Sequence, residues 1–319
     1  MTHMKKNILV VDDSALMRRV MCDIINSDSK FQATDYCRDG LEAYEKLKHT
    51  SYDGVVLDVN MPRMDGLQLL EKLQKEGIRA NVVMVSTLTD SREADVTILA
   101  MERGAIDFVA KPTNIIEAKG EAFKRQLLGV LNAVLATQKA AESVRPAVKP
   151  AAKAPMMRKA TGGKNKLVAL ACSTGGPKAL QSVIPFLPKE LDAPVVLVQH
   201  MPPGFTKMYA ERLNNQCRVV VREAKTGDRV VPGQVLIAPG DAHMRLLKVN
   251  GEYQVECRSG PKVNGHCPSV DVLFESVAKA AGAGAVGIIL TGMGNDGAKG
   301  LLEMRRAGAK TIGQNEASC

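Results

Sequence analysis

The sequence lacks any apolar run near the roughly 20 residues that a membrane-spanning helix needs. In its first residues, MTHMKKNILVVDD, charged residues follow the apolar run before it is long enough to form the core of a signal peptide. None of its seven cysteines belongs to a CxxC pair or follows a metal-ligand spacing. We therefore expect reduced thiols rather than a disulfide framework. These absences favour a cytoplasmic protein that does not insert into a membrane.

The chain lacks the nucleotide-binding loop GxxxxGK[ST]. The net charge of +9 would suggest a nucleic-acid partner, but most of it lies in residues 138–166, where the net charge is +7. Residues 167–319 carry a net +4 and no recognition-helix pattern, so we expect no nucleic-acid partner. The basic stretch is rich in Ala, Pro and Lys, which is typical of a solvated linker. We predict a domain over 1–137, a linker over 138–166 and a second domain over 167–319.

Polar side chains end four buried strands of the first domain. Asp12 and Asp13 follow NILVV, Asp58 follows VVL, the third strand ends at Ser86 and the fourth at Lys111. Helical patterns separate these strands, which predicts a parallel sheet whose carboxyl ends share one edge. Three carboxylates at one edge favour a hard divalent cation such as Mg²⁺, beside which an aspartate can accept a phosphoryl group. The alternative, four surface loops with ordinary caps, leaves this combination of residues unexplained.

Three strand–loop–helix units stand out in the second domain. They are LVALACSTGGPKAL with Ser173, APVVLVQHMPPGF with His200, and AVGIILTGMGNDGAKG with Asp296. If the strands are parallel, these side chains share one sheet edge and match a nucleophile, a base and an orienting carboxylate. Each has a plainer alternative, because Ser173 and Asp296 could cap the following helices and a lone histidine is more often structural. Only the three units together favour a hydrolase.

The glycines around these residues leave two functions open. Gly175 and Gly176 permit a tight turn behind Ser173, and the GMGNDG loop leaves backbone N–H groups that could bind an oxyanion or a phosphate. A module that binds a phosphorylated or anionic ligand is therefore the alternative to a hydrolase. Successive residues of a strand point to opposite sides, so we expect Cys172 in the core wall and Ser173 in the site.

Residues 5–130 resemble the response-regulator receiver domain, which implies a flavodoxin-like doubly wound fold. The resemblance implies that Asp58 is phosphorylated with the help of Mg²⁺. It implies metal binding by Asp13, Asp58 and the Asn60 carbonyl, with Asp12 acting through water. It also implies that Ser86 and Lys111 sense the phosphoryl group and that Phe108 is the switch aromatic. A chemotaxis histidine kinase would then be the phosphodonor.

The motifs ACSTGGP, QHMPPGFTKMYAERLN, IAPGDAHM, PSVDVLFESVA and GIILTGMGNDGAKG of the second domain resemble the chemotaxis protein-glutamate methylesterase of the CheB type. The resemblance implies a Rossmann-like α/β domain in which Ser173 is the nucleophile, His200 the general base and acid, and Asp296 the orienting carboxylate. It places a backbone oxyanion donor at Met293, with Thr174 near the serine. The implied reaction is hydrolysis of glutamate methyl esters on methyl-accepting chemoreceptors, without a cofactor for the ester chemistry. Many members also deamidate receptor glutamines.

The combined resemblance implies an enzyme of bacterial chemotactic adaptation whose unphosphorylated receiver restrains the catalytic domain, so that phosphorylation activates it. Family chains continue beyond TIGQNEASC, where this sequence stops. We therefore expect the C-terminal end of the second domain to be truncated.

Overall fold

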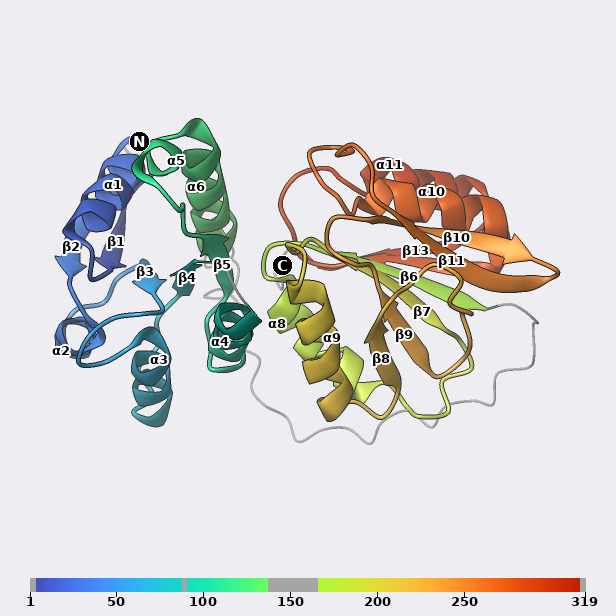
Figure 1. Ribbon diagram of the computed structural model, residues 1–319, viewed down its shortest axis with the longest axis horizontal. Helices are drawn as coiled ribbons and strands as arrows, with labels where there is room; N and C mark the ends of the chain where they lie inside the picture. Colours follow the sequence, from blue (N-terminus) through green and yellow to red (C-terminus); the bar gives the residue numbers. More distant parts are fainter. Residues whose placement is uncertain (1–3, 88–90, 137–165, 316–319) are drawn as a thin grey trace. The chain divides into compact units, whose positions relative to one another are not determined.

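The computed structural model describes residues 4–87, 91–136 and 166–315 (Figure 1). The chain divides into two compact units, Met1–Ala136 and Thr137–Cys319. The predicted linker over 138–166 lies outside the described residues except for Lys166. Within the described part of the chain, no helix is both long enough and apolar enough to cross a bilayer.

The first unit is a five-stranded parallel sheet with the order β2-β1-β3-β4-β5, which is the flavodoxin-like doubly wound order. Its strands are β1 Lys6–Val11, β2 Phe31–Cys37, β3 Gly54–Asp58, β4 Val82–Ser86 and β5 Asp107–Ala110. Its helices are α1 Ala15–Asn26, α2 Gly40–His49, α3 Gly66–Lys75, α4 Ser91–Glu102, α5 Ile115–Ala118 and α6 Glu121–Ala136. The predicted fold class is confirmed for this unit.

The helices of the first unit begin where the sequence offers side-chain caps. Asp65 accepts the Gln68 N–H while Gln68 accepts the Asp65 N–H, which is a capping box at the start of α3. In Figure 1, α1 and α6 cover one face of the sheet and α2, α3 and α4 cover the other. Because both faces are covered, β3 and β4 are buried along their whole length. The carboxyl edge of the sheet is left free to carry polar side chains.

The second unit is a six-stranded sheet in which every neighbouring pair is parallel, with the order β13-β12-β6-β7-β9-β8. Its strands are β6 Leu167–Cys172, β7 Val195–Gln199, β8 Val220–Glu223, β9 Gln234–Ile237, β12 Ala285–Ile289 and β13 Lys310–Gly313. Its helices are α8 Gly176–Gln181, α9 Phe205–Gln216, α10 Val270–Ala281 and α11 Ala298–Arg306, with short 3₁₀ turns at Ile184–Phe186 and Gly282–Gly284. Helices α10 and α11 lie on one face and α8 and α9 on the other, which confirms a second doubly wound α/β domain (Figure 1).

An antiparallel hairpin that the sequence analysis did not predict packs beside α10. It is formed by β10 His243–Val249 and β11 Glu252–Arg258, joined by the two-residue turn Asn250-Gly251 with φ of +51° and +84°. Such left-handed pairs are the preferred short hairpin turn. Met244, Leu246 and Val255 of the hairpin join α10 in the main core of the unit. The hairpin is therefore part of this core.

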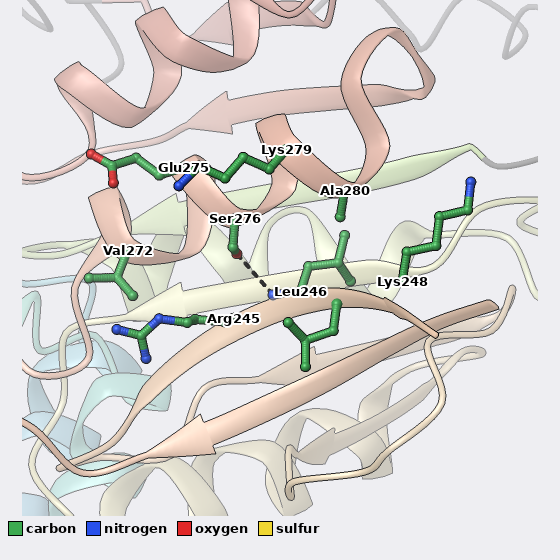
Figure 2. Close-up of a pocket in the computed structure, with 9 residues that line it drawn as sticks. Arg245, Leu246, Lys248, Val272, Glu275, Ser276, Lys279 and Ala280 are labelled. Atoms are coloured by element: carbon green, nitrogen blue, oxygen red, sulfur yellow. Dashed lines mark hydrogen bonds between the residues drawn. The ribbon is translucent and has the colours of Figure 1, made fainter. Parts of the chain in front are cut away.

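A groove of about 380 Å³ lies between β10 and α10, where the Leu246 N–H donates to Ser276 Oγ at 2.9 Å (Figure 2). Arg245, Lys248 and Lys279 line it together with Glu275. None of the predicted catalytic side chains borders this groove. The predicted chemistry belongs instead to the carboxyl ends of β6, β7 and β12, which are neighbours in the sheet.

Candidate active site and phosphoryl-acceptor site

Ser173 stands at the first position after β6, on a sharp turn into α8. The N-cap residue of α8 is Gly175 with φ of +73°, a left-handed conformation that favours glycine. No side chain caps the start of α8. The Ser173 carbonyl accepts hydrogen bonds from the Gly176 N–H at 2.8 Å and from Gln199 Nε2 at 3.1 Å. Ser173 is therefore not a helix cap, and its hydroxyl is left for another partner.

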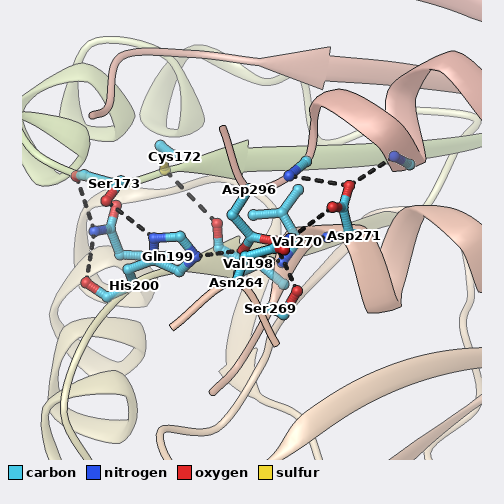
Figure 3. A network of polar contacts seen from close by, with 12 residues as sticks. Cys172, Ser173, Val198, Gln199, His200, Asn264, Ser269, Val270, Asp271 and Asp296 are labelled. Atoms are coloured by element: carbon cyan, nitrogen blue, oxygen red, sulfur yellow. Dashed lines mark hydrogen bonds and ion pairs between the residues drawn. The ribbon is translucent and has the colours of Figure 1, made fainter. Parts of the chain in front are cut away.

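That partner is His200, which directly follows β7 next to β6 in the sheet. His200 Nδ1 lies 3.0 Å from Ser173 Oγ, and His200 Nε2 lies 2.9 Å from Asp296 Oδ2 (Figure 3). The three predicted side chains thus form one continuous chain of hydrogen bonds. The His200 side chain is 11% exposed and that of Asp296 3%, so the network is largely shielded from water while remaining within reach of a substrate.

Asp296 is held by donors from several segments and does not cap α11, whose N-cap residue is Gly297. Its Oδ1 accepts from Asn264 Nδ2 at 2.8 Å and from Ser269 Oγ at 2.8 Å, and its Oδ2 accepts from the Val270 N–H at 2.7 Å. Burial alone would raise the pKa of Asp296, but the hydrogen bonds from His200 and these donors outweigh it and lower the pKa well below its usual range. The carboxylate is consequently ionised throughout the neutral range.

The loop that follows β12 approaches the serine closely. A Cβ on Gly292 would lie 3.0 Å from the Ser173 Cβ, and the Ser173 N–H donates to the Thr291 carbonyl at 3.0 Å. Thr291 Oγ1 donates to the Thr174 carbonyl at 3.0 Å, which ties this loop to the turn after β6. Met293, the predicted oxyanion donor, is next to Gly292 and its side chain is half-exposed. Thr174 therefore lies on the turn after β6 and Met293 on the loop after β12, and these two segments contact each other at Ser173.

Cys172 takes the opposite side of β6 from Ser173. It is 3% exposed, and its Sγ lies 4.0 Å from the Val198 carbonyl of the neighbouring strand. Burial raises the pKa of this thiol far above its usual value, so it does not ionise at neutral pH. The geometry agrees with the expectation that Cys172 lines the core wall.

Sequence reasoning missed the second layer of this site. His266 stacks on His200 with ring centroids 3.8 Å apart and the planes inclined by 2°, although the histidines outside His200 had no predicted role. Asn264 and Ser269, which bond Asp296, come from the same stretch of chain. The Asn264-Gly265 dipeptide, a strong two-residue turn signal, was the available clue. His243 is buried at the start of β10 and accepts from the Ser269 N–H at Nδ1, so its position is structural.

The carboxyl edge of the first unit gathers the predicted acidic residues. One carboxylate oxygen each of Asp12, Asp13 and Asp58 lies within 4.8 Å of the others. Lys111 Nζ lies 2.7 Å from Asp58 Oδ2 and 2.9 Å from Asp12 Oδ2. Burial and the charge of Asp12 raise the pKa of Asp58 to about 6, against the lowering effect of Lys111. One ammonium thus contacts two of the three clustered carboxylates, and this all-oxygen set fits a hard divalent cation such as Mg²⁺.

The remaining predicted residues of the first unit occupy the same edge or its border. Ser86 ends β4 and is buried, with its Oγ donating to the Thr87 carbonyl at 3.2 Å. Phe108 is 9% exposed on β5, and Asn60 is exposed in the loop after β3. Ser86 ends β4 and Lys111 directly follows β5, and these two strands pair through Ser86 and Ala110.

The comparisons with known proteins agree with this two-part arrangement. Residues 8–120 match the family model of the response regulator receiver domain, and residues 168–319 match that of the CheB methylesterase. A protein-glutamate methylesterase/protein-glutamine glutaminase of Salmonella choleraesuis is 49% identical over 99% of this chain and 88% of its own length. The enzyme of the same name from Escherichia coli K12 shows the same identity and coverage.

The crystal structure of the Thermotoga maritima CheB methylesterase catalytic domain is also similar, at 41% identity and a TM-score of 0.48, covering 49% of this chain and 83% of that one. The near full-length identity to named enzymes and the two family-model matches establish the relationship. The chain therefore belongs to the CheB-type family of protein-glutamate methylesterases/protein-glutamine glutaminases, with a receiver domain joined to a methylesterase domain.

Proposed function

We propose that this chain hydrolyses glutamate methyl esters on methyl-accepting chemoreceptors, releases methanol and is activated by phosphorylation of its receiver domain. The observation that carries the proposal is the position of His200, with one ring nitrogen on Ser173 Oγ and the other on Asp296. The names of its relatives add the substrate class. The free thiols of the described cysteines support a cytoplasmic setting.

The ionised Asp296 fixes the tautomer of His200. A carboxylate only accepts hydrogen bonds, so His200 Nε2 carries the proton that Asp296 Oδ2 accepts. His200 Nδ1 is then the unprotonated nitrogen, and it accepts the Ser173 hydroxyl at 3.0 Å. This is the state that a general base requires before it removes the serine proton.

The reaction follows from that state in two balanced halves. Ser173 Oγ attacks the ester carbonyl carbon as its proton moves to His200 Nδ1, and the tetrahedral intermediate collapses as His200 returns the proton to the departing methoxide. Methanol leaves and an acyl ester of Ser173 remains. Water then attacks this ester, His200 accepts its proton and delivers it to Ser173 Oγ, and a glutamate side chain is released. A receptor glutamine would follow the same path with ammonia as the leaving group.

The oxyanion of the tetrahedral intermediate needs donors close to Ser173. The contact between Gly292 and Ser173 supports the backbone N–H of Met293 for this role, because any side chain at position 292 would push the loop away. Thr174 adjoins the nucleophile and is tied to the same loop through Thr291. We assign the oxyanion site to these two residues.

In the receiver domain, Asp58 is the proposed phosphoryl acceptor and a chemotaxis histidine kinase the donor. Asp12, Asp13, Asp58 and the Asn60 carbonyl would hold Mg²⁺, which supplies the positive charge that a phosphoryl group needs beside carboxylates. Asp58 attacks phosphorus and the donor loses its bond to the phosphoryl group. Lys111, already 2.7 Å from Asp58, would bind the phosphoryl oxygens together with Ser86, and Phe108 would repack.

Phosphorylation should raise the esterase rate by about 10-fold, within the range typical of coupling between two sites. The full chain, treated with a small phosphodonor and Mg²⁺, is compared with Asp58→Asn by methanol release from methylated receptor membranes. The wild-type rate should rise and the variant's rate should stay unchanged. Omitting Mg²⁺ should abolish the increase. Equal activation of Asp58→Asn would remove Asp58 from the phosphoryl-acceptor role.

The same membranes test the function itself. Unmethylated receptor should release no methanol, and methylated receptor should release it only when Ser173 is intact. A serine-directed fluorophosphonate should label Ser173, because the labelling uses the same base-assisted nucleophile. A module that only binds an anionic ligand would neither release methanol nor react with the reagent.

A further inference from the structure

His266 lies at the end of a tight hairpin turn that places its ring at the active site. Val263 and His266 exchange two backbone hydrogen bonds, each 3.0 Å long. Between them, Asn264 and Gly265 have φ of +54° and +83°, the left-handed pair that a two-residue turn of this kind requires. The turn thereby fixes the direction in which the His266 ring leaves the backbone, and the ring lies flat on His200.

The same turn also holds the third member of the network. Asn264 Nδ2 donates to Asp296 Oδ1 at 2.8 Å and to Asp271 Oδ2 at 2.7 Å. Asp271 in turn accepts the N–H groups of Gly297 and Gly300 at 3.1 and 2.6 Å, at the start of α11. One turn therefore contacts His200 through a ring face and Asp296 through an amide, which ties the base and its carboxylate to a common support.

The two hydrogen bonds of His200 leave one motion of its ring uncontrolled. They act at Nδ1 and Nε2, on opposite sides of the ring, and so define an axis through it. Tilting about that axis changes the direction of the Nδ1 lone pair but lengthens neither bond much. A flat group against the ring face opposes this tilt, and His266 is such a group at 3.8 Å.

We propose that His266 is a positioning residue that holds the His200 ring in plane with Ser173 and Asp296 and offers its neutral ring face to the imidazolium formed during proton transfer. The inference rests on the proposed function of Ser173 and His200. An aromatic face attracts a cation held above it, so the stack favours the charged state of His200 that exists only during the reaction.

The charge state of His266 is consistent with that role. Its burial and the neighbouring His200 and Lys262 lower the pKa of His266, while Asp296 acts in the opposite direction. His266 therefore stays neutral where the reaction would run. A neutral ring can stack on an imidazolium, whereas two stacked imidazoliums would repel each other.

Three substitutions of His266 in the full chain separate a flat ring from simple volume. His266→Phe keeps a planar face, His266→Leu fills space without one, and His266→Ala leaves the face open. Because small misplacements of a catalytic group can cost up to about 100-fold, we expect kcat for methanol release to fall about 10-fold in the Ala and Leu variants. The Phe variant should stay within about 3-fold of wild type, and KM should change less than about 2-fold in all three.

Two measurements complete the test. The rate at which a fluorophosphonate labels Ser173 should follow the same order, and His49→Ala, an exposed histidine of the receiver domain, should match wild type in both assays. A Leu variant as active as the Phe variant, an Ala variant as active as wild type, or an effect mainly on KM would overturn the inference. If the Ala variant does not fold, the Leu–Phe comparison still decides. A wild-type chain without methanol release or Ser173 labelling would instead contradict the proposed function.

Discussion

Ser173→Ala is expected to lower kcat for methanol release by about 10⁶-fold, the scale on which hydrolases of this type lose activity when the nucleophile is removed. The physical reason is that no other group can take its place. Ser173 Oγ is the only nucleophile within hydrogen-bond distance of His200 Nδ1 among the contacts of the described residues. The measurement is steady-state methanol release from methylated receptor membranes, with substrate well above KM.

Cys172→Ala is the matched control, because it removes the neighbouring nucleophile-capable side chain and nothing from the site. The thiol is buried against Val198, faces away from His200 and does not ionise at neutral pH. Its loss should cost some stability but leave most of the activity. The opposite pattern, an inactive Cys172→Ala and an active Ser173→Ala, would show that the wrong nucleophile is assigned.

The Ser173→Ala, His200→Ala double variant adds a second check on the same result. Residues that act as one unit lose their function together, so the double variant should be about as slow as either single variant. Additive losses would mean that Ser173 and His200 contribute through separate steps, which the 3.0 Å contact between them does not predict.

The convergence of the three catalytic candidates could be predicted from the sequence because of a property of parallel sheets. Residues in the loop after a parallel strand lie at the carboxyl edge of the sheet. Ser173 and His200 directly follow β6 and β7, and Asp296 lies in the glycine loop between β12 and α11. The same logic placed Asp58 and Lys111 together in the receiver domain. Neither prediction needed the order of the strands, only that they belong to one parallel sheet.

The support around Asp296 could not be predicted in this way. Asn264, His266 and Ser269 lie on a turn and a helix start, and their approach to the site depends on how the β10–β11 hairpin packs against α10. The turns Asn250-Gly251 and Asn264-Gly265 are both visible in the sequence, but a turn signal gives a local shape without a position in the fold. Tertiary packing places the Asn264-Gly265 turn, and not the Asn250-Gly251 turn, next to His200.

Asp296→Asn is expected to lower kcat by about 10⁴-fold, the loss seen when an amide replaces the orienting carboxylate of a triad. The donors around Asp296 determine how the amide would lie. On the Oδ1 side an amide nitrogen would oppose two donors that cannot reverse, Asn264 Nδ2 and the Asp271 N–H, beside the Ser269 hydroxyl, which can rotate. On the Oδ2 side only the Val270 N–H cannot reverse, because His200 can change its tautomer. We therefore expect the amide nitrogen to face His200.

A donor at that position reverses the tautomer of His200. Nε2 must then accept, so the ring proton moves to Nδ1, the nitrogen that faces Ser173 Oγ. The histidine can no longer remove the serine proton, although its position hardly changes. Asp271→Asn is the matched control, because it alters the adjoining carboxylate, which bonds Asn264, Gly297 and Gly300 but does not touch His200. It should lower thermal stability as much as Asp296→Asn does and retain far more activity. A folded Asp296→Asn chain with the wild-type rate would show that this carboxylate only organises the loop before α11.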